Sequence, residues 1–99
     1  MSENKHENTN QLVVYRRRMG FSQKQVARLL GHSNSVKLST YEKGLSIPSF
    51  QTALSLEIIY RVPVAFLYPT LYDELRNHIR GLEARLPRPG QSPRISADQ

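Results

Sequence analysis

The chain has 99 residues, with 14 Lys and Arg against 8 Asp and Glu, which gives a formal net charge of +6, and it contains no cysteine. This length is enough for one domain with a modest core and too short for two, and the lack of cysteine excludes disulfides and thiolate metal sites. The longest apolar stretches, such as Val62 to Tyr68, fall far short of the roughly 20 residues that a membrane span needs. We therefore expect a single basic domain without a membrane segment, in a cytoplasmic protein.

The positive charge is concentrated in the middle of the chain. The segment from Asn10 to Tyr68 contains eight Lys and Arg but only two acidic residues, Glu42 and Glu57, so it alone carries a charge of +6. The charges of the two ends of the chain nearly cancel. Such a field attracts a polyanion and is the electrostatic footprint expected of nucleic-acid binding. The run from Arg16 to Arg18 has two other interpretations, a solvated helix face or a contact with anionic lipid.

The first helix is predicted over residues 10–18. Residues 1–9 contain no apolar residue after Met1, so we expect a disordered arm there. Leu12, Tyr15 and Met19 then recur at helical spacing, and Gly20 ends the helix.

Residues 21–44 predict two short helices joined by a turn. Ser22 is a good N-cap for the first helix, Val26, Ala27 and Leu30 share one face of it, and Gly31 ends it. The second helix can begin at Ser33, Asn34 or Ser35 and stops at Gly44. Its inward residues are Leu38 and Tyr41, and its outward residues are Lys37, Ser39 and Thr40. An ordinary helical hairpin with a solvated polar face would have the same pattern, whereas a DNA-binding protein would place the second helix in the major groove.

Two more helices complete the predicted core. A loop over residues 45–48 leads to Ser49, which caps a helix running to about residue 60. The inward stripe of that helix is predicted to be Phe50, Ala53, Leu54, Ile58 and Tyr60. Pro63 begins a short fifth helix in which Val64 and Leu67 close the core, and Pro69 is expected to break the chain.

Residues 69–86 predict a separate amphipathic helix, capped by Thr70. Its apolar residues Leu71, Leu75, Ile79, Leu82 and Leu86 recur at spacings of 4, 4, 3 and 4. Such a stripe can pack back on its own domain, or it can form a dimer seam through Leu71, Leu75, Ile79 and Leu82. Residues 87–99 are rich in Pro, Ser and Gly, so we expect a disordered tail.

No catalytic constellation is visible in the sequence. His6, His32 and His78 fall in an arm, a turn and an outer helix, without the spacing that brings two histidines to one metal ion. Phosphate-binding glycine loops and nucleophile elbows are also absent, so we expect neither an enzyme nor a cofactor or metal site.

The segment from Leu12 to Leu67 resembles the phage-repressor and Cro-type helix-turn-helix proteins, the XRE-like family of DNA-binding regulators. The residues that carry the resemblance are Arg16, Ser22, Gln23, Val26, Ala27, Leu30, Gly31, Leu38, Tyr41, Glu42, Gly44, Pro48 and Ser49. It implies an all-α fold, a compact lambda-repressor-like bundle of four to five helices over residues 10–68, here followed by the additional C-terminal helix of residues 69–86. It also implies a sequence-specific transcriptional regulator of prokaryotic or phage origin, expected to be a repressor.

The resemblance also implies roles for single residues. Double-stranded DNA would meet the recognition helix, at about residues 34–43, through base contacts from Asn34, Ser35, Val36, Lys37, Ser39 and Thr40. Phosphate contacts would come from Gln23, Lys24, Arg17 and Lys43. Arg16 and Glu42 match a structural ion pair between the first and third helices. The segment from Gly31 to Glu42 is one residue longer than the family pattern, which affects the register of the first recognition residues.

Two arrangements of partners follow. A homodimer on a two-fold operator would place two recognition helices about 34 Å apart on one face of the duplex. The alternative is a protein-interaction module or antitoxin-like protein that binds a partner protein through the bundle and the helix of residues 70–86.

Overall fold

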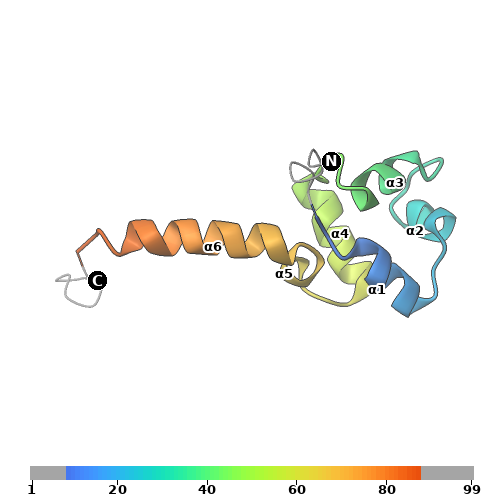
Figure 1. The fold of residues 1–99 in the computed structure, drawn as a ribbon. Helices are drawn as coiled ribbons and strands as arrows, with labels where there is room; N and C mark the ends of the chain where they lie inside the picture. Colours follow the sequence, from blue (N-terminus) through green and yellow to red (C-terminus); the bar gives the residue numbers. More distant parts are fainter. Residues whose placement is uncertain (1–8, 88–99) are drawn as a thin grey trace, which may run out of the picture.

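The computed structural model describes residues 9–87, and every regular element in that range is a helix. The helices are α1 (Leu12–Met19), α2 (Gln23–Leu29), α3 (Val36–Glu42), α4 (Phe50–Tyr60), α5 (Val64–Leu67) and α6 (Pro69–Glu83). Helices α1 to α5 gather into a bundle, and α6 projects away from it as a separate arm (Figure 1). The predicted all-α fold is therefore confirmed. Most of the expected N-terminal arm, and the expected tail beyond residue 87, lie outside the described residues.

Each of the five bundle helices supplies a fully buried residue to a single core. These residues are Leu12 from α1, Val26 from α2, Leu38 from α3, Leu56 and Tyr60 from α4, and Leu67 from α5. Helix α1 packs against both α3 and α4, and α2 packs against α3. Ala27 is buried as well, and its small side chain lets α2 and α3 approach closely. The core thus fixes α3, the expected recognition helix, against two other helices.

Short polar side chains start four of the bundle's helices. Ser22 accepts a hydrogen bond from the backbone N–H of Gln25, whose side chain accepts one from the backbone of Ser22, which makes a complete capping box. Ser49 accepts from the backbone N–H of Thr52 at the start of α4, as predicted. At the starts of α1 and α3, the side-chain oxygens of Asn10 and Asn34 accept from the backbone N–H two residues ahead. Asn34, rather than Ser33 or Ser35, is therefore the residue whose side chain caps α3.

Two glycines end the central helices where the chain must turn into the left-handed region. Gly31 after α2 has φ +83°, and Gly44 after α3 has φ +78°. These are conformations that glycine adopts without the steric penalty of a Cβ atom. The turn between α2 and α3 occupies residues 30–35, and α3 begins at Val36. Helix α3 is thus shorter than the range of 34–43 that was predicted for a recognition helix.

The predicted inward face of α4 is wrong for Phe50, Leu54 and Ile58 and confirmed for Tyr60. Phe50 is 76% exposed and Ile58 is 74% exposed, whereas Leu56 and Tyr60 are buried. Apolar residues surround this helix on all sides, so two different stripes have helical spacing and periodicity alone does not select between them. The stripe of Leu56 and Tyr60 is the one that meets the core.

The junction with α6 also differs from the prediction. Pro69 does not break the chain but is the first residue of α6, where a missing N–H costs nothing, and Tyr68 rather than Thr70 precedes the helix. Only Leu71 packs against the core. Leu75, Ile79, Leu82 and Leu86 are between 47% and 62% exposed. The alternative in which the whole stripe folds back on its own domain is therefore wrong.

Candidate nucleic-acid interface

A buried carboxylate connects the first three helices. Glu42 in α3 accepts a hydrogen bond from Nε of Arg16 at 2.6 Å and from Nη2 of the same side chain at 3.3 Å. Nε2 of Gln23, the first residue of α2, donates to Glu42 Oε1 at 2.7 Å. The Glu42 side chain is only 4% exposed and that of Arg16 12%. Arg16 and Glu42 thus form the expected ion pair, and Gln23 joins it.

This network stabilises the charged form of Arg16. The hydrogen bond to Glu42 raises the pKa of Arg16 above its ordinary value, against the opposing effect of burial. Nη1 of Arg16 also donates to the backbone carbonyl of Phe21 at 3.1 Å, in the link between α1 and α2. Two parallel bonds to a carboxylate give Arg16 a fixed orientation as well as a charge partner. The ends of α1, α2 and α3 are therefore held in one arrangement.

Three exposed cations directly follow the three members of this network. Arg17 follows Arg16 in α1, Lys24 follows Gln23 in α2, and Lys43 follows Glu42 at the end of α3. Each of these cations is exposed and adjoins one member of the network in the sequence. All three are predicted phosphate contacts.

The outer side of α3 carries the predicted base contacts. Val36, 66% exposed, and Lys37 face solvent, while Ser39 and Thr40 are partly exposed. The Thr40 hydroxyl donates to the backbone carbonyl of Val36 at 2.9 Å, which leaves its oxygen as an acceptor on the helix surface. Ser35 is partly exposed, and Asn34 uses its side-chain oxygen in the cap and keeps its amide donors. The predicted readers therefore lie on or directly before one short helix.

Sequence reasoning missed three polar contacts that organise this region. Gln23 was assigned to phosphate, and nothing in the spacing between residues 23 and 42 indicates that its amide reaches Glu42. Asn10 donates from its side-chain amide to the backbone carbonyl of Tyr41 at 2.9 Å, which ties the start of α1 to the end of α3. Glu57 accepts from the backbone N–H of Val64 at 3.1 Å and so caps α5. None of the three had a local signal, because even Glu57 lies within α4, seven residues before Val64.

The remaining titratable side chains of residues 9–87 do not assemble into another site. No group of three or more His, Asp or Glu in this range could hold a metal ion. His32 lies partly buried in the turn between α2 and α3, where its backbone N–H donates to the carbonyl of Ala27. Within the same range, no helix has the length and apolar character needed to cross a membrane.

Comparison with known proteins assigns the chain to a family. Residues 14–67, more than half of the chain, match the family model described as Helix-turn-helix, HTH_3. The match spans helices α2 and α3, the turn between them and the α5 helix that closes the core. No curated protein and no solved structure gives a significant match. The chain therefore belongs to the phage-repressor and Cro-type, XRE-like helix-turn-helix family of DNA-binding regulators.

Proposed function

We propose that this protein is a sequence-specific transcriptional repressor that binds double-stranded DNA as a homodimer, with α3 in the major groove. The observation that carries the proposal is the Arg16–Glu42–Gln23 network, which fixes α3 against α1 and α2. The exposed cations beside each member supply the charge that a phosphate backbone requires. Family membership supports a role in DNA binding.

The proposal divides the interface into two sets of contacts. Arg17, Lys24 and Lys43, with the amide of Gln23, position the bundle on the phosphates, and this set carries no sequence information. Asn34, Ser35, Val36, Lys37, Ser39 and Thr40 contact base edges. Hydroxyls bind several edges, and the Val36 methyl groups fit a thymine methyl, so the selected sequence would depend on shape and apolar contact as well as hydrogen bonds.

Selection from a randomised DNA library would test this division. The wild-type chain should enrich one motif, and Thr40→Ala should change the preferred base at one position of each half-site. Lys24→Ala should keep the motif and weaken binding to all sites alike. It should also reduce the slope of log K against the logarithm of the salt concentration by about 1. Lys24 is a better probe of positioning than Gln23, because Gln23→Ala also removes a hydrogen bond from Glu42. Uniform loss with Thr40→Ala would remove Thr40 from the reading set.

A second candidate function is that of an antitoxin-like protein that binds another protein. The observation that favours it is the exposed apolar stripe along α6, which does not pack on the bundle beyond Leu71. This function predicts that deleting the stripe abolishes partner binding while the isolated bundle shows no preference among DNA sequences. Under the repressor proposal, motif selection persists in any variant that keeps the bundle intact.

A further inference from the structure

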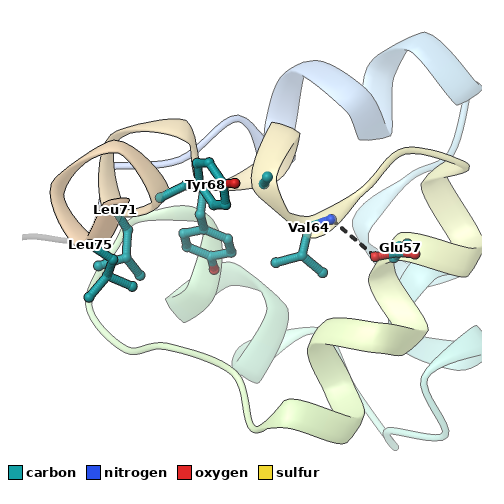
Figure 2. Close-up of a pocket in the computed structure, with 7 residues that line it drawn as sticks. Glu57, Val64, Tyr68, Leu71 and Leu75 are labelled. Carbon is teal, nitrogen blue, oxygen red and sulfur yellow. Dashed lines mark hydrogen bonds between the residues drawn. The ribbon is translucent and has the colours of Figure 1, made fainter. Parts of the chain in front are cut away.

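The apolar face of α6 begins in a groove at the bundle and continues along the helix. A hollow of about 380 Å³ is lined by Val64 and Ala65 of α5, by Glu57, and by Tyr68, Leu71, Tyr72 and Leu75. Figure 2 shows Leu71 and Leu75 on one side of this groove and Val64 with its hydrogen bond to Glu57 on the other. A second hollow of about 250 Å³ shares Tyr72 and Leu75 and extends the groove to Ile79 and Arg80. The two hollows form one strip along a helix that projects from the bundle.

The residues of this strip follow a coiled-coil repeat. Tyr72, Leu75, Ile79 and Leu82 of α6 are separated by 3, 4 and 3 residues, the alternation of the core positions of a heptad. Tyr72, Leu75, Ile79 and Leu82 are 47% to 51% exposed in the single chain. A seam with this spacing is completed by a second helix of the same kind.

We infer that the strip binds a second copy of this chain, with the two α6 helices antiparallel and their two-fold axis at the level of Asn77. The inference rests on the proposed dimeric repressor and adds the orientation and register of its seam. Residues whose numbers sum to 154 then lie opposite one another. Ile79 meets the partner's Leu75, and Leu82 meets the partner's Tyr72. Each of these layers occurs twice, as a two-fold interface requires.

Two observations select the antiparallel orientation. The groove lies at the N-terminal end of α6, and the exposed Leu82 and Leu86 lie at or just past its C-terminal end. Antiparallel pairing therefore fills each groove with the partner's leucines, whereas parallel pairing would leave both grooves open. The charges agree, because residues 69–77 carry Asp73 and Glu74 against Arg76, and residues 78–86 carry Arg80 and Arg85 against Glu83. Halves of opposite net charge face each other only in the antiparallel pair.

Mixed disulfide formation tests the orientation directly, since the chain has no cysteine of its own. Full-length Tyr72→Cys and Leu82→Cys chains would be mixed, equilibrated, oxidised gently and analysed by intact mass. Both positions are about half exposed, so neither change removes a core contact. The antiparallel seam predicts that the disulfide between the two variants greatly exceeds both disulfides between identical chains. In that seam the two copies of residue 72 would be about 15 Å apart along the helix axis, beyond the reach of a disulfide.

The matched control pair is Asp73→Cys with Gly81→Cys, which lies at the same level but lines neither hollow and should not favour the mixed product. Dominant 72–72 and 82–82 disulfides would show a parallel seam and overturn the inference. The inference would also be overturned by random pairing of the variants or by a monomer in sedimentation. A dimer that does not cross-link at either position would place the seam elsewhere and overturn it too. Motif selection by the uncross-linked chain is read separately, so a mixed disulfide without motif selection would refute the repressor function and leave the seam standing.

Discussion

At the scale of single residues, Glu42 links the core of the bundle to the proposed DNA-binding surface. Its carboxylate is almost fully buried and is held by Arg16 from α1 and Gln23 from α2. A buried charge of this kind is tolerated only while its partners remain, because its lost hydration is replaced by those hydrogen bonds. The same three contacts fix where α3 lies, so stability and the geometry of the recognition helix depend on one group.

Removing Arg16 should therefore be costly. Arg16→Ala leaves Glu42 buried with only the amide of Gln23, and we expect a loss of about 3 kcal/mol in the free energy of unfolding. Urea denaturation followed by circular dichroism would measure it. Arg17→Ala is the matched control, since Arg17 is exposed on the same helix and should change stability by less than about 0.5 kcal/mol. Equal effects of the two changes would contradict a structural role for the ion pair.

Burial of Tyr68 should make the protein less stable at alkaline pH. Burial raises the pKa of Tyr68 from 10.0 to about 12, and it also raises the pKa of Tyr60. Between these pH values the unfolded chain loses the Tyr68 proton while the folded chain keeps it, so stability is intact below pH 10 and falls as the pH rises toward 12.

Tyr68→Phe should remove its share of this alkaline loss. Between pH 8 and pH 11 we expect the variant to lose about 1 kcal/mol less stability than the wild type, measured by urea denaturation at both values. At pH 8 it should be at least as stable, because the Tyr68 hydroxyl has no hydrogen-bond partner within residues 9–87. Parallel pH curves for both proteins would show that Tyr68 ionises equally in the folded and unfolded states.

At the scale of secondary-structure elements, helix boundaries depend on a few capping side chains. Asn34 accepts from the backbone N–H of Val36, whereas the side chain of Ser35, the residue directly before α3, makes no capping bond. We expect Asn34→Ala to cost about 1 kcal/mol of stability and Ser35→Ala only a few tenths. The two variants differ by one position, so thermal melts under identical conditions would separate them. A larger loss with Ser35→Ala would place the cap at Ser35.

The same helices show which features of the fold can be predicted from the sequence alone. The starts of α2 and α4 at Ser22 and Ser49 and the ends at Gly31 and Gly44 were predictable, because their signals are local. The inward face of α4 was not, because that helix is apolar all round and only its neighbours decide that Leu56 is buried and Phe50 exposed. The contact of Gln23 with Glu42 was unpredictable for a similar reason, since it joins two residues 19 positions apart in different helices.

At the scale of the whole molecule, the described part of the chain consists of a helical bundle and a projecting helix. Helices α1 to α5 form the family bundle, and α6 extends from α5 as an arm whose apolar stripe is exposed (Figure 1). The largest dimension of the chain is 53 Å and the smallest 22 Å, which reflects this extended arm. Beyond Leu71 this 15-residue amphipathic helix does not pack on its own domain, so in the inferred seam its apolar face would be stabilised by the partner helix.

Changing the stripe should therefore alter assembly without unfolding the bundle. Leu82→Glu places a charge in the inferred seam, and we expect sedimentation to show a monomer at concentrations where the wild type is a dimer. Asn77→Glu adds the same charge on the outward face and should leave the dimer intact. The monomeric variant should also bind a two-fold operator more weakly, because it loses the linkage between half-sites. A Leu82→Glu dimer would exclude α6 as the seam.

The central claim is that the bundle reads a DNA sequence, and competition in gel shifts tests it most directly. The full-length protein would be incubated with labelled genomic fragments and excess unlabelled bulk DNA at two salt concentrations. We predict that a few fragments stay bound at the higher salt concentration while bulk binding is lost, since specific contacts persist when phosphate contacts are weakened. If every fragment is displaced equally at both concentrations, the protein binds DNA only through charge, and its role as a sequence-specific repressor is contradicted.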